Sequence, residues 1–290
     1  MRKNTQIAKK IAITGSEGML GHDLKKVFGS DKKYALVLYT KKTLDITDEK
    51  KVLQKLEKDK PDIIINAAAF TAVDDCEDKK HKKACIAVNG VGPKNVAKAA
   101  KKIGAILVQI STDYVFDGKK KSGYTERSRV GPINTYGKSK LMGEETVKKE
   151  CTKFYIVRTS WLFGKNGPNF VETMLMLGKK HPELKVVHDQ HGKPTWTYDL
   201  ALHIKKLLER NKAFGVYHCT NEGETTWYNF TREILKQAKI KTPVKPCTSE
   251  EFPRPAKRPE YSTLLNTKFS RMPHWKKALT GYLKDRKKKA

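Results

Sequence analysis

Tyr136 and Lys140 are four residues apart, so a helix at this segment would place both side chains on one face. A tyrosine hydroxyl is a weak acid with an ordinary pKa of about 10. A fixed ammonium beside it stabilises the phenolate, which lowers that pKa and suits the tyrosine to donate a proton to a carbonyl oxygen. In so lysine-rich a chain the spacing also arises by chance about once or twice, so its meaning depends on the surrounding elements.

A glycine turn near the N-terminus predicts a site for a dinucleotide. The apolar segment 11–14 predicts a strand, and Leu24, Val27 and Phe28 continue after the turn at helical spacing. Between them Gly15, Gly18 and Gly21 form Gly-x-x-Gly-x-x-Gly rather than Gly-x-Gly-x-x-Gly. We expect the first glycine to allow the tight turn, the second to let a pyrophosphate approach the backbone, and the third to let helix and strand pack closely.

The next two predicted strands point to the adenosine end of that cofactor. Strand 35–39 is followed by Lys41 and Lys42, and cations at this position favour the 2′-phosphate of NADPH, with NADH left open. Asp45 is better placed for the adenine. The apolar run 62–69 predicts a buried parallel strand that ends in the small residues Ala67, Ala68 and Ala69, against which a cofactor can lie.

Alternation of strands and helices predicts an α/β fold with a doubly wound, Rossmann-type parallel sheet. Ligands of such sheets bind at the carboxyl ends of the strands. Ser111 and Thr112 directly follow a fourth predicted strand, 105–110, and Tyr136 begins the helix that leads to a fifth, 154–158. The hydroxyl of Ser111 or Thr112 and that of Tyr136 are therefore expected to converge on one carbonyl group.

Composition excludes some classes of function. The net charge of +29 suggests nucleic acid, but the lysines come as pairs along predicted helices and are not gathered with aromatic residues, so we expect no dedicated nucleic-acid role. No apolar run reaches the roughly 18 residues of a membrane span, and no apolar signal region follows the basic first ten residues. Five scattered cysteines without a Cys-x-x-Cys indicate reduced thiols. We predict a cytoplasmic protein without a membrane association.

The ordered motifs together resemble the extended short-chain dehydrogenase/reductases, and more narrowly the dTDP-4-dehydrorhamnose reductases. Besides the glycine turn, the resemblance rests on Asn66-Ala67-Ala68-Ala69, Ser111-Thr112-Asp113-Tyr114 and Tyr136-Gly137-Lys138-Ser139-Lys140. It extends over segments 44–48, 88–89, 158–161, 169–171, 189–195 and 258–262, and so covers nearly the whole chain.

The resemblance implies hydride transfer from NADPH to C4 of a nucleotide-linked 4-keto-6-deoxysugar, with dTDP-4-dehydro-L-rhamnose as the expected substrate. It implies that Tyr136 is the proton donor, that Lys140 lowers its pKa and holds the nicotinamide ribose, and that Thr112 bonds the reacting oxygen. The further residues assigned to the cofactor are Met19, Leu20, Ile46, Asn89 and Ser111. Those assigned to the substrate, besides Thr112, are Asp113, Tyr114, Trp161, Asn169 and Arg258.

The resemblance also implies a division of the chain. Residues 1–160, joined by 185–212, are expected to bind NADPH, and the rest of 161–290 to form a smaller substrate-binding lobe. In this later half the sequence pattern predicts strands at 185–189 and 216–220 and an amphipathic helix at 197–209. A metal is not needed for the reaction, and His188 and His191 lack a third ligand nearby. Family members can dimerise, so a homodimer is possible.

One departure concerns the substrate, because Ser128 stands where the family usually has an acid, in a segment expected to border the pocket. Three alternatives stay open at this point: a reductase for another nucleotide-linked ketosugar, a non-catalytic subunit resembling the regulatory β subunit of methionine adenosyltransferase, and nucleic-acid binding driven by charge.

Overall fold

The computed structural model describes residues 8–287, so most of the first ten residues, for which no signal region is predicted, lie outside it. Within this range one parallel sheet has six strands in the order β2-β1-β3-β4-β5-β10. The strands are β1 (Lys9–Thr14), β2 (Tyr34–Tyr39), β3 (Ile63–Asn66), β4 (Ile106–Thr112), β5 (Phe154–Thr159) and β10 (Gly215–His218). The prediction of a doubly wound parallel sheet is confirmed.

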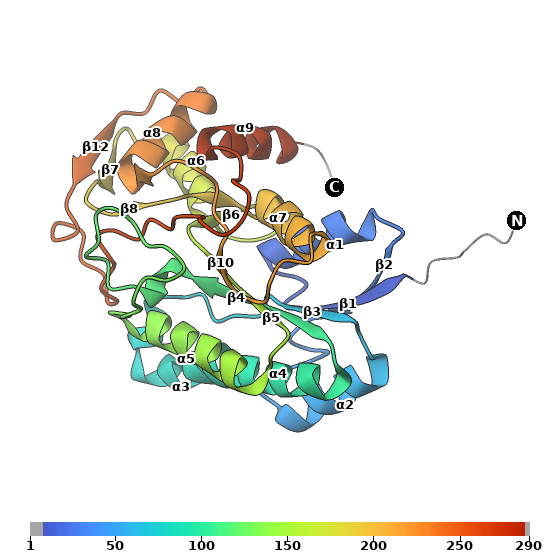
Figure 1. The fold of residues 1–290 in the computed structure, drawn as a ribbon. Helices are drawn as coiled ribbons and strands as arrows, with labels where there is room; N and C mark the ends of the chain where they lie inside the picture. Colours follow the sequence, from blue (N-terminus) through green and yellow to red (C-terminus); the bar gives the residue numbers. More distant parts are fainter. Residues whose placement is uncertain (1–7, 288–290) are drawn as a thin grey trace, which may run out of the picture.

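Helices cover both faces of this sheet (Figure 1). One face packs against α1 (Met19–Gly29) and α7 (Thr197–Glu209), and the other packs against α2 (Glu49–Asp59), α4 (Gly92–Ile103) and α5 (Thr135–Glu150). Alternate residues of each strand supply the two cores: Ile11 and Ile13 face α1, whereas Ala12 faces the opposite layer. The central strands are largely apolar because both of their faces are buried, as in β3, where all four residues are buried.

The strand order reverses beside β1, which pairs with β2 on one side and with β3 on the other. Parallel register brings the carboxyl ends to one edge: Thr14 lies beside Asn66, and Thr112 lies beside Thr159. In open α/β sheets the crevice outside this edge, at such a reversal, is where ligands bind.

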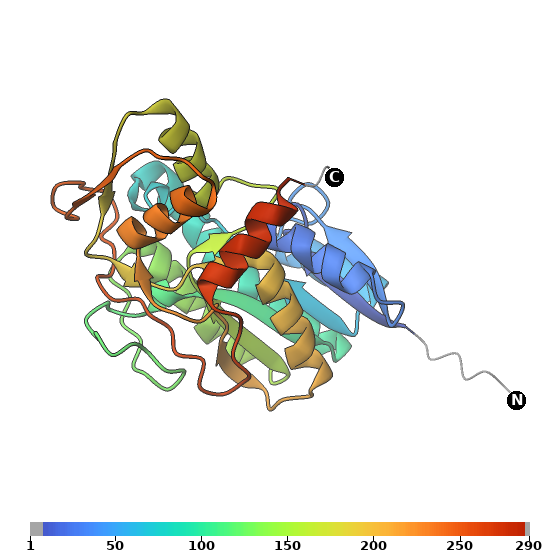
Figure 2. The same cartoon turned by 90° about the horizontal axis from the view of Figure 1, so that it is seen from above.

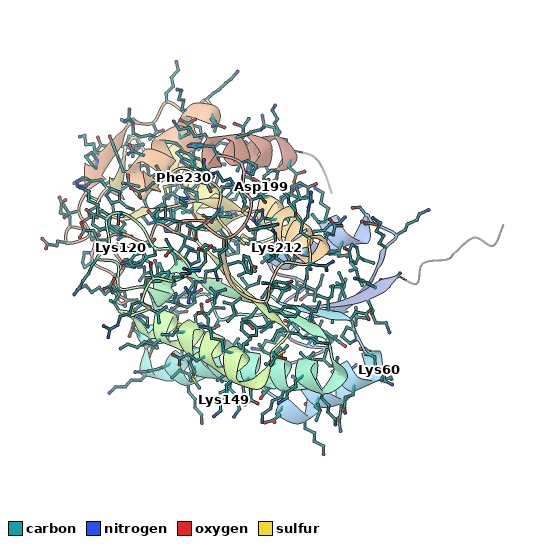
Figure 3. The ribbon with its side chains drawn as sticks, in the orientation of Figure 1. Lys60, Lys120, Lys149, Asp199, Lys212 and Phe230 are labelled. Carbon is teal, nitrogen blue, oxygen red and sulfur yellow. The ribbon has the colours of Figure 1, made fainter. Side chains whose placement is uncertain are left out.

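A second group of elements packs around its own core, beside the main sheet (Figure 2). It contains α6 (Phe170–Lys180), α8 (Trp227–Gln237), α9 (Trp275–Asp285) and a parallel pair, β7 (Leu184–Val187) and β12 (Val244–Cys247). Phe230, labelled in Figure 3, is fully buried in this core. The strand predicted at 185–189 belongs to this lobe, whereas α7 and β10 complete the main sheet layer.

The remaining elements are short. They are a 3₁₀ turn (Asp75–Glu77), α3 (Lys79–Ile86), a π-helical turn (Ala87–Val91), a second 3₁₀ turn (Asp113–Val115), β6 (Leu162–Phe163), β8 (His191–Gly192), β9 (Thr195–Trp196) and β11 (Thr225–Thr226). Strand β6 pairs with β9, and β8 pairs with β11.

The charge is spread over the surface. Lys60, Lys120 and Lys149 lie at different edges of the molecule (Figure 3). All five cysteines are buried as free thiols, as expected for packing residues. No helix within residues 8–287 is long and apolar enough to cross a membrane.

Candidate active site

A cavity of about 820 Å³ lies at the carboxyl edge of the main sheet. The turn after β1, the ends of β2, β3 and β4, the start of α5 and the segment that follows β5 all contribute to its lining. The predicted site residues that line it are Gly15, Gly18, Met19, Leu20, Gly21, Lys41, Asp45, Ile46, Ala67, Ala68, Ala69, Ser111, Thr112, Asp113, Tyr114, Tyr136, Lys140 and Trp161.

The glycine turn forms a cradle of bare backbone. Gly15 has a φ of +66°, and a methyl group added to it would lie 2.7 Å from the backbone nitrogen of Ala68. A methyl group at Gly21 would lie 2.3 Å from the carbonyl oxygen of Gly15. Gly18 is the N-cap of α1, which has no acidic residue in its first turn. The positive end of the helix therefore faces the cavity, which suits an anionic pyrophosphate. Glu17, the residue directly before the cap, also lines the cavity.

Tyr136 and Lys140 reach the cavity from the first turns of α5. Asn134 caps this helix, since its side-chain oxygen accepts a hydrogen bond from the backbone N–H of Gly137 at 2.7 Å. The ring of Tyr136 meets that of Tyr114 edge to face, with centroids 5.8 Å apart. Tyr136, Tyr114 and Thr112 all line the cavity, to which the start of α5 and the end of β4 bring them.

The protonation states differ from the simple picture of a lysine that lowers the tyrosine pKa. Burial raises the pKa of Tyr136 above its ordinary value, the charge of Asp113 raises it further, and Thr112 offsets part of the shift. Burial lowers the pKa of Lys140 to about 8. Its ammonium donates a hydrogen bond to the carbonyl oxygen of Ile110 at 2.7 Å. Without ligands, Tyr136 is therefore held as the neutral phenol, which is the form a proton donor needs.

Asp113 is a buried acid whose two oxygens differ in their hydrogen bonds. Its Oδ1 accepts a hydrogen bond from the Thr112 hydroxyl at 2.9 Å, whereas its buried Oδ2 accepts no hydrogen bond of good geometry within the described structure. The Ser262 hydroxyl is a nearby donor that opposes the effect of burial on the pKa of this carboxyl. Burial raises the pKa of this carboxyl to about 6. An unpaired buried carboxylate oxygen is costly, so a ligand hydroxyl that donates to it would be favoured.

Two tryptophans build an aromatic wall on the lobe side of the cavity. The rings of Trp161 and Trp227 stack with centroids 3.5 Å apart, and both residues line the cavity. Trp161 has a φ of +48°, an uncommon conformation for a residue with a side chain. Gly192 makes room for its indole, since a methyl group there would lie 2.5 Å from Cε2 of Trp161. Strained backbone held in this way is a feature of functional sites.

Trp227 and segment 166–168 are lining residues that the sequence patterns did not single out. Trp227 begins α8, and its indole N–H donates to Oε1 of Gln190 at 3.1 Å. No local spacing relates it to Trp161, so only the packing of the lobe brings the two rings together. A tryptophan directly after the paired threonines of β11 was the one available signal.

Four of the predicted site residues lie outside the lining. Lys42 is exposed, and Asn89 is buried, where its side chain bonds the backbone N–H and carbonyl oxygen of Phe70. Asn169 caps α6 and donates to the carbonyl oxygen of Gly164 at 2.8 Å. Arg258 forms an ion pair with Asp74. Their predicted ligand contacts stay predictions.

Asp74 holds the loop that carries Arg258. Its carboxylate accepts from Arg258 at 2.8 Å and from Arg254 at 3.0 and 2.5 Å, and its Oδ1 also accepts from the backbone N–H of Ala256. These bonds hold the pKa of Asp74 at about 2, against the opposing effect of burial. The proline-rich and basic loop is therefore fastened to the segment that follows β3 rather than free in solvent.

The segment around Ser128 does not border the cavity, contrary to expectation, since none of residues 124–129 lines it. Ser128 bonds the backbone N–H of Thr125, and the buried Glu126 accepts from the backbone N–H groups of His218 and Thr267. The departure from the family pattern therefore falls in a structural turn. No group of three or more possible metal ligands occurs within residues 8–287.

A doubly wound parallel sheet, a glycine cradle and a Tyr-x-x-x-Lys pair beside it define the class of short-chain dehydrogenase/reductase folds. Residues 9–288 match the model of the RmlD substrate binding domain, and the chain belongs to this family.

Relatives and solved structures extend the comparison. The chain is 40% identical over 281 residues to the spore coat polysaccharide biosynthesis protein SpsK of Bacillus subtilis, covering 96% of this chain and 98% of that protein. It is 40% identical to the dTDP-4-dehydrorhamnose reductase of Streptomyces griseus, covering 92% and 91%. The structure of dTDP-4-dehydrorhamnose reductase from Bacillus anthracis in complex with NADP superimposes with a TM-score of 0.92 at 41% identity, covering 96% and 100%.

Proposed function

We propose that this protein is an NADPH-dependent reductase that converts the C4 keto group of dTDP-4-dehydro-L-rhamnose to the hydroxyl of dTDP-L-rhamnose. The observation that carries the proposal is that Thr112, Tyr136 and Lys140 line the same cavity as the glycine cradle. The similarity to dTDP-4-dehydrorhamnose reductases, one of them solved with NADP, supports both the cofactor and the substrate.

The residues present fit NADPH. Gly15, Gly18 and Gly21 leave room for a pyrophosphate at the N-terminus of α1, and a cation, Lys41, lines the cavity near the end of β2. NADPH supplies a hydride when it is bound. Ala67, Ala68 and Ala69 provide the small surface along which the cofactor would extend toward Ser111 and Lys140.

The chain itself orients the carbonyl group and supplies the proton. In this proposal the hydroxyls of Thr112 and Tyr136 donate hydrogen bonds to the carbonyl oxygen, which fixes the sugar and stabilises the negative charge that develops there. Tyr136 then gives its proton to the oxygen as the C–H bond forms at C4. The ammonium of Lys140, on the same face of α5, stabilises the phenolate that is left.

The sugar nucleotide would lie between the main sheet and the lobe. We assign the cofactor to the main sheet and the sugar end to Asp113, Tyr114, Trp161 and the lobe that supplies Trp227. Oδ2 of Asp113 would accept a hydrogen bond from a sugar hydroxyl. The alternative of a non-catalytic binding subunit is disfavoured by the unobstructed Thr112, Tyr136 and Lys140, and a reductase of another nucleotide-linked ketosugar is the runner-up.

We extend the proposal to a cytoplasmic location, supported by five buried, free cysteines. Assembly as a homodimer is the second extension, and it rests on the family resemblance alone.

The test is oxidation of NADPH, followed by its absorbance, on addition of dTDP-4-dehydro-L-rhamnose. Tyr136→Phe removes the proton donor and keeps the ring, so kcat should fall about 100- to 10,000-fold while the Kd for NADPH changes less than about twofold. Tyr124→Phe is the matched control, because that hydroxyl bonds Asp117 away from the cavity, and its turnover should be close to that of the wild type.

Two results would contradict the proposal. Turnover by Tyr136→Phe within about tenfold of the wild type would remove Tyr136 as the proton donor. Tight NADPH binding by the wild type with no turnover of any 4-ketosugar nucleotide would favour the non-catalytic subunit.

A further inference from the structure

A buried ion pair lies behind the end of β4 and the first turns of α5, and it takes no part in the proposed hydride and proton transfer. Glu144 of α5 is 0% exposed, and Arg158 of β5 is 2% exposed. Arg158 donates from Nε to Oε1 of Glu144 at 2.8 Å and from Nη2 to Oε2 at 2.6 Å. Neither residue lines the cavity. Burying two charges costs several kcal/mol for each, so such a pair adds little to stability by itself and invites a functional explanation.

The pair reaches the cavity through two residues that do line it. Glu144 stands four residues after Lys140, which itself stands four after Tyr136, so α5 presents all three on one face. The hydroxyl of Ser111 donates to Oε1 of Glu144 at 2.6 Å, and the ammonium of Lys140 donates to the carbonyl oxygen of Ile110. Helix α5 therefore holds two consecutive residues at the end of β4, directly before Thr112.

We propose that Glu144 is a positioning residue whose carboxylate keeps the buried Lys140 ammonium charged and fixes the Ser111 end of β4 beside Thr112. The inference rests on the proposed reductase function, because it concerns the same Tyr136 and Lys140. Arg158 has the secondary role of holding the Glu144 carboxylate in place with two hydrogen bonds, so that the acid stays ionised beneath the cavity.

The electrostatic surroundings agree with this role. Lys140 is 4% exposed, and burial lowers its pKa to about 8, while the Glu144 charge opposes the shift. The pKa of Glu144 is lowered because its hydrogen bonds and ion pair with Arg158 outweigh burial. The other titratable or charged groups near this cluster are Tyr136 and Lys148 on α5, Asp113 after β4, Cys85 on α3, and His218 on β10 with its neighbour Glu126. Glu144 is the first of the groups that act to raise the pKa of Lys140.

Removal of the Glu144 charge should lower the pH at which the enzyme loses activity. Lys140 stabilises the phenolate of Tyr136 only while it is protonated, so activity should be present below its pKa and lost as the pH rises through about 8. Removing the Glu144 charge lowers that pKa further, because a nearby opposite charge favours the charged form by about one to three units. The alkaline limb of the pH profile should move to lower pH, not higher.

The experiment compares Glu144→Gln with Glu145→Gln on the full chain. The first substitution keeps an acceptor for the Ser111 hydroxyl and removes only the charge, whereas Glu145 is the next residue of the same helix and is exposed. Glu144→Gln should lower the alkaline limb of kcat/KM by about one pH unit. Glu145→Gln should leave the limb within about 0.2 units, because exposed charges are screened.

A second readout does not depend on turnover. Competitive acetylation followed by mass spectrometry gives the titration midpoint of the Lys140 amine without cofactor or substrate. That midpoint should fall in Glu144→Gln by the same amount as the limb. If the wild type lacks reductase activity, this measurement still tests the effect of Glu144 on Lys140, and the two failures are thereby distinguished.

A double variant avoids leaving the buried Arg158 without a charged partner, which could destabilise the fold. Glu144→Gln combined with Arg158→Met removes both buried charges, and the Lys140 midpoint should again fall, since Arg158 is not among the groups that shift it. A midpoint equal to that of the wild type in whichever variant folds would overturn the proposal and leave the ion pair a purely structural contact. A fall in kcat with an unmoved limb would do the same.

Discussion

Two regions around the cavity differ in how their polar side chains are used. At the catalytic edge, which is the end of β4 with the first turns of α5, Thr112 and Tyr136 line the cavity, and Oδ2 of Asp113 accepts no hydrogen bond of good geometry from the described residues. At the lobe rim, defined as Asn169 with segment 254–258, Asn169 caps a helix and Arg258 pairs with Asp74. The first region keeps polar groups available for a ligand, whereas the second uses them to hold the protein together.

This difference shows where a sequence motif can predict a contact with a ligand and where it cannot. A motif at the catalytic edge lies within continuous elements, so its spacing determines which face its residues occupy. A motif at the lobe rim contains residues whose positions depend on contacts between distant segments, as between Asp74 and Arg258. The same degree of family similarity therefore supports a ligand role more strongly in the first region than in the second.

Among the variants that test the difference between the two regions, Thr112→Val should have the largest effect on kcat. The substitution keeps the shape of the side chain and removes the hydroxyl that donates to Asp113 in the free protein. If that hydroxyl turns to the carbonyl oxygen of the substrate, kcat should fall about 100-fold, the effect of losing one such donor. Thr112→Ser keeps the hydroxyl and should recover most of the rate. A Thr112→Val enzyme with nearly normal kcat would show that Tyr136 alone holds the carbonyl.

Much of the fold could be predicted from the chain alone. The strands at 11–14, 35–39 and 154–158 and the helix at 197–209 follow from apolar runs and helical periodicity, since local pattern decides them. The strand predicted at 185–189 has a similar pattern but pairs with β12, whereas Gly215–His218 supplies the sixth strand of the main sheet. Which strand a segment pairs with depends on contacts between residues far apart in the sequence, so the local pattern does not predict it.

The site residues likewise fall into those that local pattern predicts and those that only tertiary packing brings to the cavity. Residues of the glycine turn, of the β4 end and of α5 all reach the cavity because consecutive elements of a parallel sheet bring their ends to one edge. Trp227 escaped prediction because it enters from the lobe. The burial of Glu144 and Arg158 also escaped prediction. Charged residues, in a helix as for Glu144 or near the end of a strand as for Arg158, normally indicate a solvated position, and only the structure shows the pair enclosed.

An intermediate effect is expected at Arg258. If it exchanges Asp74 for the diphosphate of the substrate, Arg258→Gln should raise the KM for the sugar nucleotide about tenfold, with kcat within about twofold, since a charge-assisted hydrogen bond is lost. Arg254→Gln is the matched control, because Arg254 bonds the same carboxylate and is much more exposed. Its KM should change less than about twofold. Equal effects of the two variants would mean that both arginines only fasten the loop to Asp74.

The smallest expected effect on activity is that of Asn169→Ala, which separates the structural use of this residue from its predicted contact with substrate. Asn169 accepts from the backbone N–H of Glu172 and donates to the carbonyl oxygen of Gly164. Loss of the cap should lower the free energy of unfolding in urea by about 1 to 2 kcal/mol. Because Asn169 does not line the cavity, kcat/KM at about 25 °C should stay within about twofold of the wild type.

Asn169→Asp completes the test of this residue. Aspartate keeps the acceptor for Glu172 but cannot donate to Gly164, so its loss of stability separates the cap from the second hydrogen bond. A large fall in kcat/KM in Asn169→Ala, with the unfolding free energy unchanged, would contradict the structural account. Asn169 would then belong with Thr112 and Tyr136 among the groups that contact the substrate. The difference between the two regions would then rest on Arg258 alone.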